Sequence, residues 1–183
     1  NIRYLHHLGE VTYFSPLADT SLPDAGFVYL PGGYPELYLA ALSANRQMLQ
    51  SIRRYVESGG KLLAECGGMM YLCDEIRDKN GYVYPMAGVL HQSATMENMK
   101  LRLGYRTLLY NETRLKGHEF HYSRLVEQQN PLPSCAVAYT AKGVETDTPL
   151  YHYKNVWAGY THLYWADPVG NEWFTKFVID GNT

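Results

Sequence analysis

The chain has 183 residues and a formal net charge of −2, a length that suits one domain with a full hydrophobic core. Its 46% hydrophobic and 19% charged residues are typical of a globular protein, and the nearly balanced charge argues against a nucleic-acid partner. No apolar run approaches the roughly 18 residues of a membrane span and no secretory signal opens the chain, so we expect a cytoplasmic protein without a membrane partner.

The first part of the chain predicts alternating helices and strands. A short helix should end at Gly9, and strands are expected over residues 10–14 and 26–31. The second strand runs into the turn Pro31-Gly32-Gly33, and a helical stretch follows over residues 35–45. These segments indicate a strand, a glycine turn and a helix in succession.

The same unit then repeats. A helix is predicted over Arg46–Glu57, where Leu49, Ile52 and Val56 share one face, and glycines separate it from an apolar strand over residues 61–65. Strands separated by helices of about ten residues indicate crossover connections, which build a parallel sheet with helices on both faces. The first half of the chain is therefore predicted to be α/β.

The second half predicts mainly β structure. From Gly81 onward short alternating segments are separated by turns, and a closing helix is expected behind Asp167-Pro168. The predicted fold class is α/β, with a mostly parallel central sheet covered by helices and a β-rich second half.

Cys66 stands at the most informative position in the sequence. An apolar strand runs into Cys66-Gly67-Gly68 and then into a segment with helical apolar spacing. A nucleophile on such a turn is exposed above the sheet, and the helix N-terminus behind it favours the thiolate. Three cysteines in a chain of this size indicate free thiols in a reducing compartment. A buried structural cysteine is the alternative interpretation.

Two glycine turns predict a site for a negatively charged oxygen. Ends of neighbouring parallel strands converge, so the amide of Gly67 and that of Gly32 or Gly33 can point at one ligand. Glycine permits the close approach of the backbone that this requires. An ordinary Pro-Gly-Gly turn is the alternative.

His162 is the best candidate for the base that a thiol nucleophile needs, because it follows an apolar strand. A metal site built from Cys66, Cys73, His118 and His121 is disfavoured, since two residues an odd number apart on a strand point to opposite faces. We therefore expect no metal.

Five ordered motifs, which span nearly the whole chain, resemble those of one family, the C-terminal glutamine amidotransferase domain of cobyrinic acid a,c-diamide synthases. The chain is similar to this family, within the cobyric acid synthase and dethiobiotin-synthetase-like superfamily, at Phe14–Asp19, Leu30–Leu37, Ala64–Leu72, Gly117–Ser123 and Tyr160–Trp165. The resemblance implies a flavodoxin-like class I amidotransferase fold over residues 1–183, with glutamine hydrolysis by Cys66 and His162. From the two glycine turns, the oxyanion hole is expected at Gly33 and Gly67.

The resemblance also implies partners. Ammonia from L-glutamine would serve the ATP-dependent amidation of the a and c carboxylates of cobyrinic acid in cobalamin biosynthesis. ATP and Mg2+ are expected on an N-terminal synthetase domain, because this chain has no P-loop motif, and that domain and a preceding strand are expected to lie outside the 183 residues. Hydrogenobyrinate or Ni-sirohydrochlorin as acceptor, or a non-catalytic module of the same fold, are the alternatives.

The resemblance leaves one position open. Many class I amidotransferases have glutamate two residues beyond the histidine, whereas this chain has Tyr164. Glu65 and Glu119 are the candidate carboxylate partners. Glu119 and His121 share a strand face, where they, with Gly32, are candidates for binding glutamine or lining a domain interface; a solvated polar face is the alternative.

Overall fold

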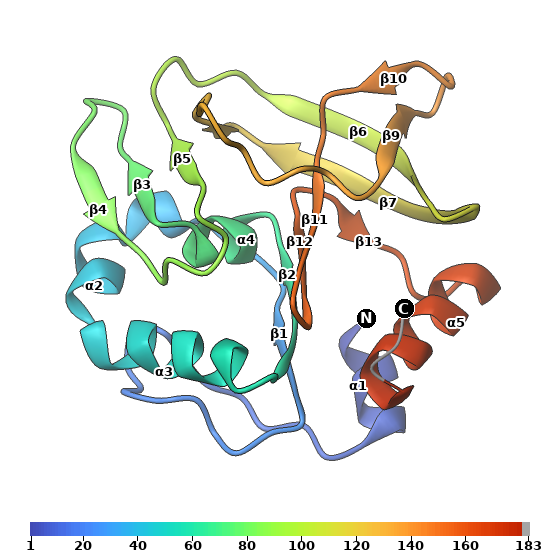
Figure 1. Cartoon of the computed structure of the whole chain (residues 1–183), viewed down its shortest axis with the longest axis horizontal. Helices are drawn as coiled ribbons and strands as arrows, with labels where there is room; N and C mark the ends of the chain where they lie inside the picture. The colour runs from blue at the N-terminus through green and yellow to red at the C-terminus, as the bar shows by residue number, and fades with distance from the viewer. Residues whose placement is uncertain (181–183) are drawn as a thin grey trace.

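The computed structural model describes residues 1–180 and is built on a central four-stranded sheet (Figure 1). The strand order is β1-β2-β12-β11. The first two pairings are parallel and the last is antiparallel. These strands are β1 (Phe27–Leu30), β2 (Lys61–Glu65), β12 (Val156–Gly159) and β11 (Leu150–Tyr153). The mostly parallel central sheet predicted from the sequence is confirmed.

Helices cover both faces of this sheet, as predicted. One face carries η1 (Pro35–Leu37), α2 (Leu39–Ala44), α3 (Arg46–Glu57) and α4 (Gly67–Leu72), and the other carries α1 (Ile2–Leu8) and α5 (Pro168–Asp180). Alternate side chains of β2 explain the two layers, because Leu62 and Ala64 join the core under the first group of helices, whereas Leu63 joins the core under α5.

The second half of the chain forms two further sheets, so the expected β-rich half is confirmed. A five-stranded sheet has the order β10-β9-β6-β7-β13, and a four-stranded sheet has the order β4-β3-β5-β8. The first comprises β6 (Arg102–Tyr110), β7 (Thr113–His121), β9 (Val137–Thr140), β10 (Glu145–Thr146) and β13 (His162–Leu163). The second comprises β3 (Glu75–Arg77), β4 (Val83–Pro85), β5 (Ser93–Thr95) and β8 (Arg124–Leu125).

The longer helices form where the sequence predicts them. Helix α3 has the predicted bounds, and its side chains at Leu49, Ile52 and Val56 are buried. Helix α5 buries Trp173, Phe174 and Phe177 against the far face of the sheet. None of the helices within residues 1–180 has the length and apolar character needed to cross a membrane.

Two local predictions differ from the structure. Residues 10–14 form no strand, because their side chains are largely exposed and no neighbouring strand pairs with them. The helical stretch over residues 35–45 is divided into η1 and α2 at Tyr38, whose ψ of 18° and φ of −132° lie outside the helical region. Apolar periodicity therefore predicts a strand or helix correctly only where neighbouring parts of the fold pair with it or pack against it.

Candidate active site

The candidate site lies where three strands of the central sheet end side by side. Leu30 of β1 pairs with Ala64 of β2, and Glu65 pairs with Gly159 of β12. The residues that follow these strands are the Pro31-Gly32-Gly33 turn, Cys66 and the segment leading to His162. The predicted convergence of these segments is confirmed, and it follows from the shared direction of parallel strands.

Cys66 occupies a sharp elbow between β2 and α4. Its backbone has φ 50° and ψ −113°, a conformation that a non-glycine residue rarely adopts. A Cβ atom at Gly67 would lie 2.6 Å from the carbonyl oxygen of Gly33, and one at Gly68 would lie 2.3 Å from that of Leu30. Only glycine fits after Cys66, so the two glycines are required by packing against the end of β1.

The three cysteines are free thiols, as predicted, but they differ in environment. Burial and the neighbouring Asp74 raise the pKa of the Cys73 thiol, and burial raises the pKa of Cys135 to about 11. Both therefore remain protonated near neutral pH. Cys66 Sγ lies 3.8 Å from the carbonyl oxygen of Phe120, on β7 of the five-stranded sheet. The nucleophile candidate thus sits between two sheets and is buried, with 7% of its surface exposed, so the predicted exposure is wrong because the five-stranded sheet packs against the elbow.

His162 reaches Cys66 from the second sheet. The chain leaves β12 at Gly159, and His162 pairs with His118 of β7 in the five-stranded sheet. The two imidazole rings stack with centroids 5.1 Å apart. Interaction with Cys66 and then with Glu65 outweighs burial and raises the pKa of His162 to about 9. The arrangement therefore favours an imidazolium beside Cys66.

Glu65 supplies the carboxylate beside this histidine. Its Oε2 lies 3.5 Å from His162 Nδ1, and the same oxygen accepts a 2.6 Å hydrogen bond from the Tyr29 hydroxyl. The amide of Leu163 donates to Oε1 at 3.0 Å. Of the two carboxylates that the sequence left open, the structure brings Glu65 to His162. Sequence reasoning missed Tyr29. Its one signal is strand register: Tyr29 pairs with Leu63, which lies on the same face of β2 as Glu65.

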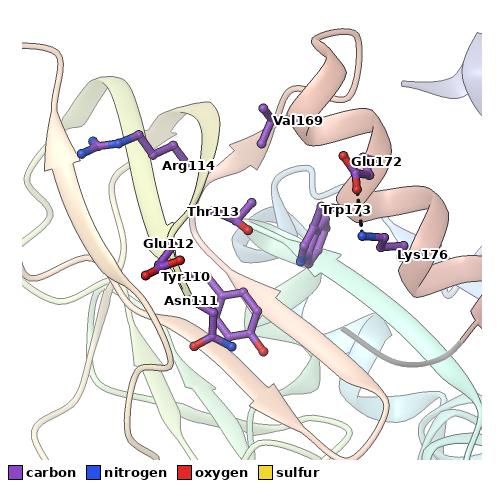
Figure 2. Close-up of a pocket in the computed structure, with 9 residues that line it drawn as sticks. All are labelled: Tyr110, Asn111, Glu112, Thr113, Arg114, Val169, Glu172, Trp173 and Lys176. Atoms are coloured by element: carbon purple, nitrogen blue, oxygen red, sulfur yellow. Dashed lines mark hydrogen bonds and ion pairs between the residues drawn. The ribbon is translucent and has the colours of Figure 1, made fainter.

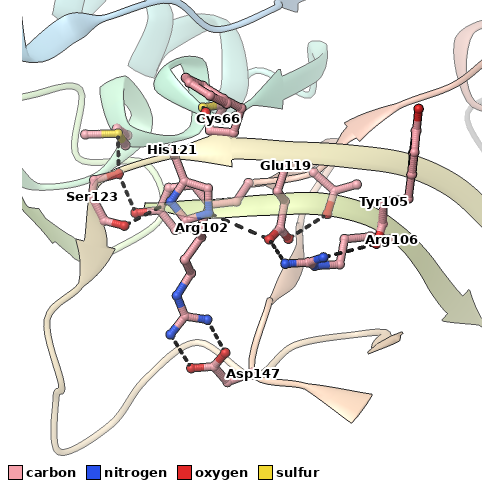
Figure 3. Close-up of polar contacts among 12 residues, drawn as sticks. Cys66, Arg102, Tyr105, Arg106, Glu119, His121, Ser123 and Asp147 are labelled. Atoms are coloured by element: carbon pink, nitrogen blue, oxygen red, sulfur yellow. Dashed lines mark hydrogen bonds and ion pairs between the residues drawn. The ribbon is translucent and has the colours of Figure 1, made fainter. Parts of the chain in front are cut away.

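Glu119 and His121 lie on the buried face of β7, so the solvated polar face considered for them is wrong. Figure 3 shows their contacts. Glu119 forms an ion pair of 2.9 Å with Arg106 and accepts a hydrogen bond from Thr161. The His121 ring stacks on Tyr160 with centroids 3.8 Å apart. The pair packs against the segment that joins β12 to β13, because sheet packing buries this face of β7.

The Gly32 turn lies directly against the other site residues. A Cβ atom at Gly32 would lie 2.9 Å from the carbonyl oxygen of Glu65, 3.2 Å from Cε1 of His162 and 3.4 Å from Cβ of Cys66. The backbone of Gly32 and Gly33 has φ 105° and 135°. The amide of Gly67 is the first in helix α4 and has no partner within that helix. The turn and the helix thus bring the backbone of Gly32 and the amide of Gly67 close to Cys66.

Two of the grooves on the part of the chain that the structure describes differ in their distance from Cys66. One of about 310 Å³ adjoins the Gly32 turn and is lined by Gly33, Gly67, Tyr71 and the loop at Phe14. The other, of about 600 Å³, lies between the β6–β7 hairpin and α5 (Figure 2). At about 3.3 Å per residue, Arg114 in this second groove is roughly 20 Å along β7 from Phe120. Only the first groove adjoins the candidate site.

Among residues 1–180 no three His, Cys, Asp or Glu side chains come together as a metal-binding group. His118 and His121 point to opposite faces of β7, as predicted, since His118 is exposed and His121 is buried. The site described here uses a thiol, an imidazole and a carboxylate.

Fold and site together define an α/β protein with a cysteine at a strand-to-helix elbow and an imidazole beside it. Residues 1–169 match the model of the CobB/CobQ-like glutamine amidotransferase domain. The chain belongs to this family.

Curated relatives agree with this family, and a solved structure shares the fold. The chain is 39% identical over 173 residues to a cobyrinate a,c-diamide synthase of Fusobacterium nucleatum, covering 90% of this chain and 38% of that relative. It is also 39% identical over 170 residues to a hydrogenobyrinate a,c-diamide synthase of Pseudomonas aeruginosa, covering 90% of this chain and 37% of that relative. A crystal structure of a glutamine amidotransferase superposes with a TM-score of 0.54 at 18% identity, covering 84% of this chain and 79% of that one, which shows a shared fold. The chain spans about two fifths of the length of these curated relatives.

Proposed function

We propose that the chain hydrolyses L-glutamine and supplies the ammonia for amidating the a and c carboxylates of cobyrinic acid. The observation that carries this proposal is Cys66 on a strained elbow, with His162 beside it and backbone amides nearby. Glutamine hydrolysis fits the family of this domain, and the amidation is the activity for which the longer relatives are named. Cobyrinic acid is proposed as the acceptor because the Fusobacterium nucleatum relative, of whose length this chain covers 38%, is a cobyrinate a,c-diamide synthase.

In the proposed cycle the Cys66 thiolate attacks the side-chain amide carbon of glutamine. The amides of Gly33 and Gly67 hold the resulting oxyanion, and the imidazolium of His162 donates its proton to the departing nitrogen as the C–N bond breaks. Ammonia leaves and a glutamyl thioester remains. Neutral His162 then takes a proton from water as water attacks the thioester, and release of glutamate restores the thiolate–imidazolium pair.

Gly32 and the part of β7 that carries Glu119 and His121 are proposed to contact glutamine, but not through the side chains of Glu119 and His121. The side chains of Glu119 and His121 are buried among groups of the protein. Their part of β7 would therefore meet glutamine through its main chain near Phe120, beside Cys66. The Gly32 turn also lies beside the nucleophile, since a Cβ atom at Gly32 would be 3.4 Å from Cβ of Cys66.

The ammonia would be used by a synthetase domain that binds ATP, Mg2+ and the corrinoid acceptor. The curated relatives carry more than half of their length outside the matched region, which leaves room for that domain. Hydrogenobyrinate is the second candidate acceptor, because a relative of equal identity is a hydrogenobyrinate a,c-diamide synthase. A cytoplasmic location stays a prediction.

Replacing Cys66 with alanine tests the proposal. In the complete protein that contains this chain, Cys66→Ala should abolish amidation with glutamine and leave amidation with added ammonium at the wild-type rate, because only the nucleophile is lost. The measurement compares the two nitrogen sources with cobyrinate and hydrogenobyrinate as acceptors. Loss of both activities in a folded variant would contradict the assignment.

Covalent labelling separates the enzyme from a non-catalytic module. A glutamine analogue that carries an electrophile should modify the wild-type chain at Cys66 and leave Cys73 and Cys135 unmodified, because burial keeps those two thiols protonated. Absence of labelling at Cys66 would favour the module.

A further inference from the structure

We propose that Glu65 is the carboxylate that positions His162, and that Tyr29 holds Glu65 in place for this task. The inference rests on the proposed glutamine hydrolysis and adds two positioning residues to it. Neither residue touches the reacting atoms; both would act through the imidazole ring. Glu65 would thus orient His162, the role that a glutamate two residues beyond the histidine has in many class I amidotransferases.

The contacts of Glu65 are those of an orienting carboxylate. The side chain is buried, with 1% of its surface exposed, and both oxygens have partners. Oε1 accepts a hydrogen bond from the amide of Leu163, the residue next to His162, and Oε2 faces His162 Nδ1 at 3.5 Å. A buried carboxylate is costly unless it is hydrogen-bonded and paired with a cation. The protonated ring of His162 is a cationic partner within reach, so folding places the imidazole ring and the carboxylate next to each other.

The position of Glu65 in the chain links it to the nucleophile. Side chains alternate along β2, so Glu65 lies on the same face as Leu63, which packs toward α5. Cys66 follows at once on the elbow, so carboxylate and thiol approach His162 from adjacent residues. The side chain of Tyr164, two residues beyond His162, is instead 55% exposed and offers no buried carboxylate.

Tyr29 completes the arrangement from the neighbouring strand. Its ring packs on Trp165 with centroids 4.9 Å apart, and its hydroxyl donates to Glu65 Oε2 at 2.6 Å. Burial and the charge of Glu65 raise the pKa of Tyr29, so the hydroxyl stays protonated and can only serve this carboxylate as a donor. The hydrogen bond restricts the rotamers of Glu65 to those that face His162.

The groups around the His162 ring determine how its titration responds. Cys66, Glu65 and His118 face the ring, and Tyr29 reaches it through Glu65. The pKa of about 9 lies above the ordinary value, so the imidazolium persists through neutral pH and is lost as the pH rises through about 9. Removing the charge of Glu65 should lower this pKa, and the alkaline limb of the activity profile should then move to lower pH.

The test uses Glu65→Gln and Tyr29→Phe in the complete protein, with glutamine hydrolysis and an NMR titration of His162 as readouts. Glu65→Gln keeps an acceptor for the Leu163 amide but removes the charge. It should lower kcat about 10- to 100-fold with KM for glutamine within about twofold, and shift the His162 titration to lower pH. Tyr29→Phe should act in the same direction, with a loss of about 3- to 10-fold.

Matched controls remove the same groups elsewhere. Glu75→Gln breaks an ion pair with Arg77, and Tyr4→Phe removes a hydroxyl that contacts Thr175. Neither should alter kcat or the titration. A folded Glu65→Gln variant with wild-type kcat and an unshifted titration would overturn the inference. The proposed function would still stand in that case if Cys66→Ala lost activity with glutamine and kept activity with ammonium.

Two further outcomes remain decisive. If Glu65→Gln does not fold, Tyr29→Phe decides the matter, because an unchanged His162 titration in that variant would overturn the inference. If the wild-type protein hydrolyses no glutamine, the proposed function fails, and the titration still measures whether Glu65 holds the imidazolium.

Discussion

At the scale of single residues, the site depends on where side chains are missing. Cys66 accepts an unusual backbone conformation, and glycines at positions 32, 67 and 68 let the ends of β1 and β2 approach within a distance that a Cβ atom would prevent. Cys66 is one of several non-glycine residues with a positive φ, and it is the one that lies beside the imidazole of the site, where such strain is common.

Gly32→Ala should therefore impair the site more than the fold. A Cβ atom there meets a backbone oxygen and the His162 ring, and the positive φ alone costs about 1–2 kcal/mol. We expect a loss of glutamine hydrolysis of about 100-fold, from displaced backbone amides and imidazole. Gly143→Ala is the control, because Gly143 has φ 76° and open space around it. Equal losses of hydrolysis in both variants would contradict this account.

At the scale of elements, helix α3 shows why its predicted bounds were confirmed. Its apolar residues repeat on one face, and Asn45 caps its start because its side-chain oxygen accepts a hydrogen bond from the amide of Met48. The Asn45 side chain also donates to the carbonyl oxygens of Pro16 and Asp19. One residue thus starts the helix and fixes the long loop that passes beside the Gly32 turn.

Asn45→Ala should lower the free energy of unfolding by about 1–2 kcal/mol, because the cap and the two loop contacts are lost together. Urea denaturation monitored by circular dichroism measures the change. Asn80→Ala, in an exposed turn, should change stability by less than about 0.5 kcal/mol. A loss in Asn45→Ala no larger than in this control would contradict the prediction.

At the scale of the whole molecule, the two candidate catalytic groups belong to different sheets. Cys66 follows β2 of the central sheet, whereas His162 lies on β13 of the five-stranded sheet. The buried contacts of Arg106, Glu119 and Thr161 lie where the chain crosses from one sheet to the other. These contacts therefore join β6 and β7 to the segment that leads from β12 to His162.

Glu119→Gln should weaken this junction. Burial alone would raise the pKa of Glu119, but the neighbouring His121, Thr148 and Arg106 hold it below its usual range, so the ionised carboxylate stabilises the fold above pH 4.5. The variant leaves Arg106 with an uncompensated buried charge, and we expect a loss of about 3 kcal/mol at pH 7. The loss should shrink as the pH falls, because the wild-type carboxylate is then protonated as well.

The control for this prediction is Asp147→Asn, which breaks the exposed ion pair with Arg102. That pair should contribute less than about 1 kcal/mol. Urea denaturation at pH 7 and at pH 4 compares the two variants. Equal losses would show that the buried network does not hold the sheets together.

Much of the fold and part of the site could be predicted because the signals are local. The bounds of α3, the strand over residues 61–65 and the elbow at Cys66 follow from apolar spacing, glycine punctuation and the turn that a nucleophile requires. The failed strand over residues 10–14 shows the limit of such signals, because strand formation needs a partner that the sequence does not specify.

The sequence by itself determined a cysteine at a strand-to-helix elbow, a glycine turn beside it and a histidine after a late strand, because short-range sterics and periodicity encode each of these features. Only the tertiary structure decided that His162 comes from a second sheet, that Glu65 rather than Glu119 is its carboxylate neighbour, and that Tyr29 contacts that carboxylate. Those relations depend on strand register and on which face of each strand becomes buried when the sheets pack, and residues far apart in the chain settle them jointly.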